Sequence, residues 1–156
     1  KPAIDEAGGF DPRYPTSEDF LLWLRIGTRH RIVRVPEVLA YYHHHDGARA
    51  TADAARVARN QWLVQRAFLR ERPESAARLG RRRVREITHG ALLEKGYACY
   101  WKRDLEPARK IFRMVMKTGY GSGKDWARML PSLLPLSAHR NLIGLLDPAG
   151  KQNTHE

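Results

Sequence analysis

Cysteine is almost absent from this chain of 156 residues, which contains only Cys99. One thiol cannot form a disulfide within the chain, so the sequence is not that of a disulfide-stabilised secreted domain and fits a reducing compartment. Long apolar runs are also lacking, and none approaches the roughly 18 residues of a membrane-spanning helix. The chain does not open on a charged stretch followed by an apolar one, so we predict no targeting segment.

Acidic residues are scarce in the second part of the chain. The whole sequence has 28 Lys and Arg against 17 Asp and Glu, a net charge of +11. Residues 1–53 contain seven basic and eight acidic residues, whereas residues 54–156 contain 21 basic and nine acidic ones. Such a contrast predicts a domain boundary near residue 52. We expect one segment over 1–52, a basic helical extension over 53–148 and a disordered tail over 149–156.

The first segment combines a loop, one helix and short extended pieces. Glycine and proline predict a loop over 1–16, and apolar spacing predicts a helix from residue 17 to about residue 26, with Trp23 in the core. Residues rich in β-favouring side chains predict strands over 32–35 and 38–42. We expect the only β structure of the chain there, between about residues 30 and 43.

The second segment has helical periodicity from Ala54 onwards. Within it, Gly96, Ala108 and Phe112 resemble a single tetratricopeptide-type helix hairpin, in which small residues let two helices approach and the aromatic ring fills the groove. One such repeat is weak evidence for a peptide-binding array, since arrays need about three. We interpret the three residues as a local packing device.

A sequence of short motifs occupies residues 2–51. It reads Gly8-Gly9-Phe10-Asp11, then Ser17-Glu18-Asp19, Leu22-Trp23-Leu24-Arg25, and finally a Leu-Ala-Tyr-Tyr-His-His-His run that ends at His45. This run resembles the C-terminal part of the catalytic domain of inverting family-2 glycosyltransferases of GT-A fold. The resemblance does not extend to the rest of the chain. It implies an α/β fragment, the C-terminal part of a nucleotide-sugar transferase domain, followed by a mostly α-helical region, predominantly α overall.

The resemblance assigns catalytic roles to Asp19 and Glu18. Acids in the first turn of a helix are ordinarily favoured by its dipole alone, by roughly 0.3–1 kcal/mol. In the family, the second acid is the general base that deprotonates the acceptor hydroxyl as it attacks the anomeric carbon, with inversion. That role falls on Asp19, and Glu18 would orient the base or the acceptor. We expect Asp11 to border the acceptor site, and Arg25 to bind there or hold the acidic pair by a salt bridge.

The histidines His43 and His45 point to one face of an extended segment, a moderate signal for a metal site. The resemblance places His45 by the donor diphosphate, where it would bind a divalent cation, Mn²⁺ or Mg²⁺. His43 stands where the family has arginine, so the leaving group would meet less positive charge.

The family's donor-binding features, an Asp-x-Asp stretch and an N-terminal βαβ region, are missing. The chain also opens on Lys1 directly before the motifs, so we expect a fragment of a longer protein that does not turn over alone. The partners implied are a nucleotide-sugar donor and a glycan or lipid-linked acceptor, in the cytoplasm or peripherally at the inner face of an anionic membrane.

The alternative is a basic helical module for an anionic surface or nucleic acid. The tryptophans are not interleaved with basic residues, so we expect no nucleic acid. The cluster Arg81, Arg82, Arg83 and Arg85 is either a solvated face or a contact for anionic lipid or acidic glycan.

Overall fold

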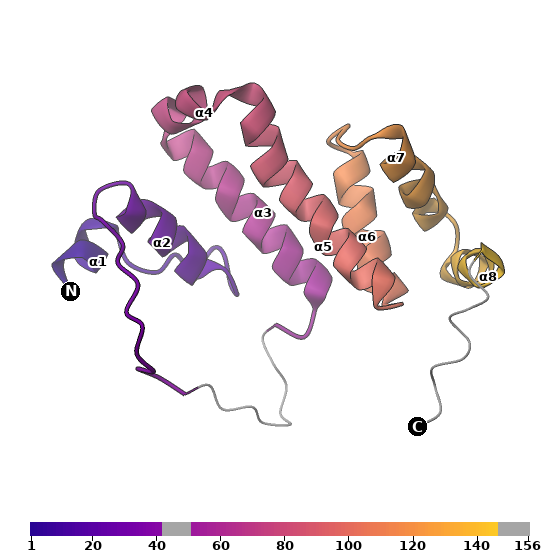
Figure 1. The fold of residues 1–156 in the computed structure, drawn as a ribbon, viewed down its shortest axis with the longest axis horizontal. Helices are drawn as coiled ribbons and strands as arrows, with labels where there is room; N and C mark the ends of the chain where they lie inside the picture. The colour runs from indigo at the N-terminus through magenta and orange to yellow at the C-terminus, as the bar shows by residue number, and fades with distance from the viewer. Residues whose placement is uncertain (42–50, 147–156) are drawn as a thin grey trace. The chain divides into compact units, whose positions relative to one another are not determined.

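The computed structural model describes residues 1–41 and 51–146. The chain divides into two compact units, Lys1–Arg78 and Leu79–Glu156, called here the N-terminal and C-terminal units. This division into compact units falls after Arg78. The domain boundary predicted near residue 52 stays a prediction. Figure 1 follows the helices along the chain: α1 (Pro2–Glu6), α2 (Glu18–Gly27), α3 (Ala54–Glu71), α4 (Pro73–Arg85), η1 (Glu86–Gly90), α5 (Ala91–Trp101), α6 (Leu105–Met116), α7 (Gly123–Met129), η2 (Leu130–Leu133) and α8 (Leu136–Leu146).

The predicted α/β character is wrong, whereas the predominantly α character is confirmed. No strand occurs in residues 1–41 or 51–146, and residues 31–41 are without regular structure. The side chains of Val33, Val38 and Tyr41 are 72%, 76% and 84% exposed. β propensity reflects packing against neighbouring strands rather than an intrinsic backbone preference. Because the described residues offer these positions no partner strand, β-favouring side chains alone do not produce a sheet.

The N-terminal unit is held together by the packing of α2 on α3. Helix α2 buries Leu21, Leu22 and Ile26, and α3 contributes small or β-branched residues, including Ala58 and Val64. Small residues on α3 let the two helix backbones approach. Helix α3 begins at a side-chain cap, in which the Asp53 carboxylate accepts a hydrogen bond from the Arg56 backbone N–H at 2.9 Å. Such caps typically contribute about 1 kcal/mol.

The core of the C-terminal unit is the hairpin of α5 and α6. Helix α6 buries Ala108, Ile111, Phe112 and Val115, the spacing of one helical face. A methyl group added at Gly96 of α5 would lie 2.7 Å from two ring carbons of Phe112. The absence of a side chain at Gly96 therefore sets how closely α5 approaches α6, as expected of a local packing device.

His139 of α8 is a buried group whose titration should affect stability. Within the described part of the chain, neither ring nitrogen has a hydrogen-bond partner. Burial lowers the pKa of His139, and the positive charges of Arg109 and Arg113 add to this. An imidazole in the unfolded chain has a pKa of about 6.5. The unfolded state therefore takes up a proton at a higher pH than the folded state does, so the folded state loses stability as the pH falls below about 6.5.

We expect the urea midpoint of the 156-residue chain to be lower at pH 5 than at pH 8. Part of that decrease should be missing in His139→Leu, which removes the titrating group and keeps an apolar side chain. Urea titrations of both proteins at the two pH values would measure the difference. His30→Leu is the control, because it makes the same replacement at a histidine that is partly exposed rather than buried. An identical pH dependence in wild type and His139→Leu would show that His139 has no part in it.

Candidate functional site

The loop between α1 and α2 begins at two glycines in left-handed conformation. Gly8 and Gly9 have φ values of +83° and +66°, which residues with a Cβ rarely adopt. The Gly9 N–H donates to the Ile4 carbonyl at 3.0 Å, which closes the end of α1. This turn directs the chain into the segment that carries Phe10 and Asp11.

Asp11 is buried and held by a neighbouring arginine. Nε of Arg13 donates to Oδ1 at 2.9 Å and Nη2 donates to Oδ2 at 2.6 Å, a two-point pair. The Arg13 backbone N–H also donates to Oδ1, at 3.1 Å. The hydrogen bonds from Arg13 lower the pKa of Asp11 to about 2. This carboxylate shapes the loop at neutral pH, and its predicted contact with an acceptor stays a prediction.

The predicted catalytic acids lie in the first turn of α2. The Glu18 carboxylate turns back and accepts a hydrogen bond from the Ser17 N–H at 2.9 Å. Asp19 is exposed, and its Oδ1 accepts from the Phe20 N–H at 2.7 Å. Acidic side chains are common in the first turn of a helix because they interact favourably with its dipole. The Asp19 carboxylate is thus accessible to a substrate, while Glu18 is occupied with the start of the helix.

The backbone immediately before these acids is strained. Thr16 has a φ of +72°, an unusual value for a β-branched residue. The segment is fixed from α3, where Nδ2 of Asn60 donates to the Pro15 carbonyl at 2.6 Å. Strain of this kind clusters at active sites and ligand-binding segments, where the surrounding structure maintains it.

The predicted burial of Trp23 is wrong: the side chain is 56% exposed. Trp23 follows Asp19 by four residues, so the two side chains share one face of α2 one turn apart. The buried face of α2 is formed instead by Leu21, Leu22 and Ile26. The exposed Trp23 ring offers an apolar surface to a ligand. The Asp19 carboxylate, one turn away, offers the same ligand a proton acceptor.

Arg25 does not form the predicted salt bridge to the acidic pair. Its guanidinium binds Glu71 of α3, with Nε 3.0 Å from Oε2 and Nη2 2.7 Å from Oε1. This two-point pair raises the pKa of Arg25 and joins α2 to the end of α3. Both residues line a cavity of about 330 Å³, together with Arg29 and Arg72. A substrate-binding role for Arg25 stays a prediction.

The other predicted ligands, His43 and His45, lie outside the described residues. Within residues 1–41 and 51–146, no three His, Cys, Asp or Glu side chains come together as a metal-binding group. The same part of the chain contains no helix with the length and apolar character needed to cross a bilayer.

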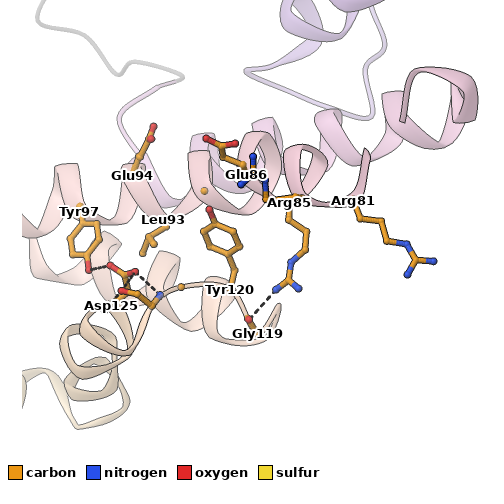
Figure 2. A pocket seen from close by; sticks show the side chains of 13 residues that line it. Arg81, Arg85, Glu86, Leu93, Glu94, Tyr97, Gly119, Tyr120 and Asp125 are labelled. Atoms are coloured by element: carbon orange, nitrogen blue, oxygen red, sulfur yellow. Dashed lines mark hydrogen bonds between the residues drawn. The ribbon is translucent and has the colours of Figure 1, made fainter. Parts of the chain in front are cut away.

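The C-terminal unit has a groove that sequence reasoning found only in part. Its volume is about 1010 Å³. Figure 2 shows it between the helical stretch that runs from Arg81 to Tyr97 and the segment that connects α6 to α7. The basic cluster indicated one wall. The opposite wall, which includes Tyr120 and Asp125, is far away in sequence, and no motif marked it.

Comparisons of this chain with protein-family models, with curated proteins and with solved structures find no match.

Proposed function

We propose that residues 2–51 form the acceptor side of an inverting, nucleotide-sugar-dependent glycosyltransferase site, in the synthesis of a cell-surface glycan or polysaccharide. The observation that carries the proposal is the exposed Asp19 carboxylate at the start of α2, one turn before the exposed Trp23. The strained, α3-supported segment before Asp19 agrees with it. The resemblance of the motifs supplies the reaction class.

In this mechanism Asp19 takes the proton of the acceptor hydroxyl. The acceptor oxygen attacks the anomeric carbon from the face opposite the diphosphate, so the new C–O bond forms as the bond to the diphosphate breaks. The configuration at that carbon inverts, and the diphosphate leaves with the electron pair. Trp23 would pack against the acceptor sugar ring, as aromatic side chains pack against apolar faces. Glu18 acts indirectly, by fixing the first turn of α2 through the Ser17 N–H.

Donor binding is assigned to His45 and His43, with a divalent cation, Mn²⁺ or Mg²⁺. These cations take mostly oxygen ligands, which a diphosphate provides, and one imidazole would add to them as a minor ligand. The partners of the proposed enzyme are a nucleotide-sugar and a glycan or lipid-linked acceptor. We place it in the cytoplasm, with peripheral contact to an anionic membrane. A basic helical binding module is the alternative function, which the arginines of the C-terminal groove favour.

The donor assignment is tested with the complete natural polypeptide that contains this sequence. In calorimetric titrations with a panel of nucleoside diphosphates, one member should bind in the presence of Mn²⁺ and more weakly in its absence. We expect His45→Ala to weaken the Mn²⁺-dependent binding by about tenfold or more, the usual cost of losing a group around a metal. His30→Ala is the matched control and should bind like the wild type. A wild-type protein that binds no nucleoside diphosphate under either condition would contradict the proposed function.

A further inference from the structure

The basic end of the C-terminal groove consists of Arg81, Arg82 and Arg85. Arg81 and Arg85 are four residues apart and so share one face of the helical stretch. Nη2 of Arg85 donates to the Gly119 carbonyl at 3.0 Å, and its guanidinium carbon lies 5.9 Å from the centre of the Tyr120 ring. These contacts fix Arg85 across the groove from its own helix (Figure 2).

No ion pair between these arginines and an acid occurs in the described part of the chain. Glu86 is the acid next to them in sequence, and its carboxylate pairs with Arg83 at 2.9 Å. In Figure 2 the Glu94 carboxylate points away from Arg85 and Tyr120. Among the described residues, no carboxylate forms an ion pair with Arg81, Arg82 or Arg85. The groove therefore has a positive end whose arginines form no ion pair within the described part of the chain, although Glu86 and Glu94 also line it.

The rest of the groove is aromatic and rich in hydroxyl and carboxylate groups. Tyr120 lies over Gly90, where an added methyl group would be 2.9 Å from the Tyr120 hydroxyl. At the far end, the Tyr97 hydroxyl donates to Oδ1 of Asp125 at 2.6 Å, and Oδ2 accepts from the Ser122 N–H at 2.7 Å. These hydrogen bonds, that from Tyr97 first, lower the pKa of Asp125. The Asp125 carboxylate at this end of the groove is thus held in place and ionised at neutral pH.

We propose that this groove binds a sugar phosphate, either free or as a phosphorylated unit of a glycan. Guanidinium groups bind phosphate oxygens through pairs of parallel hydrogen bonds, which matches the arginine end. A sugar ring has an apolar face for Tyr120 and hydroxyl groups that can donate to the Asp125 end. The site lies in a different unit from Asp19, and the proposal does not depend on glycosyl transfer.

A merely solvated row of arginines would differ in two respects. It would face open water rather than a groove of about 1010 Å³, and none of its side chains would be fixed by another segment, as Arg85 is by Gly119 and Tyr120. The π-helical turn η1, over Glu86–Gly90, adds a third observation, because such turns occur frequently at functional sites. Its residue Gly90 provides the space that Tyr120 fills.

The test is calorimetric titration of the 156-residue chain with glucose 6-phosphate, inorganic phosphate and glucose. We expect glucose 6-phosphate to bind saturably, and glucose at least about tenfold more weakly, because charge-assisted hydrogen bonds are the strong ones. The double variant Arg81→Gln/Arg82→Gln should weaken the binding of glucose 6-phosphate by at least about tenfold. Both residues are exposed, so the variant should keep the helical circular dichroism of the wild type.

A control variant, Lys102→Gln/Arg140→Gln, removes the same charge from exposed positions outside the groove. An equal loss of binding in the control would overturn the proposal, because the attraction would then come from the overall charge. Absence of binding by the wild-type chain would overturn it too. Tyr120→Leu should weaken glucose 6-phosphate more than inorganic phosphate, and equal weakening would exclude ring contact with the sugar. Binding to phosphatidylglycerol vesicles without any binding of glucose 6-phosphate would overturn the assignment and make the arginines a membrane contact.

Discussion

Replacing Asp19 by asparagine in the complete natural polypeptide is expected to lower kcat for glycosyl transfer by about 10²- to 10⁴-fold, the usual contribution of general-base catalysis. Asparagine keeps the shape of the side chain and can still accept the hydrogen bond from the Phe20 N–H, so the start of α2 is preserved. It cannot take the acceptor proton. Steady-state kinetics with a nucleotide-sugar and its acceptor would measure the loss, and NMR of the product would report the anomeric configuration.

The Asp19→Asn replacement should lower kcat without a matching loss of donor affinity, and this contrast is as informative as the size of the loss in kcat. Because the base acts on the acceptor, the affinity for the donor nucleotide should stay close to that of the wild type. Asp5→Asn is the control, since Asp5 is an exposed acid of α1 and should leave kcat unchanged. If Asp19→Asn kept nearly full kcat, the base would be another acid. Glu18 and Asp11 would then be the next residues to replace.

Local sequence signals predicted the longer helices well, because a helix satisfies its hydrogen bonds within one segment. The loop expected over 1–16 is wrong at its start, where Pro2–Glu6 form the short helix α1. The expected helix from residue 17 to about residue 26 corresponds to α2, Glu18–Gly27. The apolar residues of α6 recur at helical spacing, and they are the buried ones. The prediction failed at residues 32–35 and 38–41, where strand formation would need a partner that β-favouring residues do not themselves provide.

The candidate sites show the same division between local and distant signals. The acids Glu18 and Asp19 could be singled out as candidates from the sequence because their motif is contiguous, and their roles stay predictions. The pairing of Arg25 with Glu71 joins residues 46 positions apart, and that of Tyr97 with Asp125 joins residues 28 positions apart. Spacing along the chain carries no signal for such pairs. Trp23 was misassigned for a related reason, since the face of α2 that is buried depends on where α3 packs.

The packing of Phe112 against Gly96 leads to the second large expected effect. Phe112→Ala should lower the free energy of unfolding by about 3–5 kcal/mol, the usual cost of removing a buried phenylalanine ring. The ring is completely buried between α5 and α6. Urea denaturation of the 156-residue chain would measure the change. Phe10→Ala is the matched control, because Phe10 is 62% exposed and its loss should change stability by no more than about 0.5 kcal/mol.

The same contact predicts that the effect of Gly96→Ala changes sign with the residue at position 112. In the wild type, the added methyl group would lie 2.7 Å from the buried Phe112 ring, and overpacking of this kind typically costs about 1–3 kcal/mol. In the Phe112→Ala background that clash is removed. The higher helix propensity of alanine should then stabilise α5 by up to about 1 kcal/mol. A double-mutant cycle by urea denaturation measures both steps. Equal effects of Gly96→Ala in the two backgrounds would show that Gly96 does not set the approach of α5 to α6, because residues in contact are expected to be coupled.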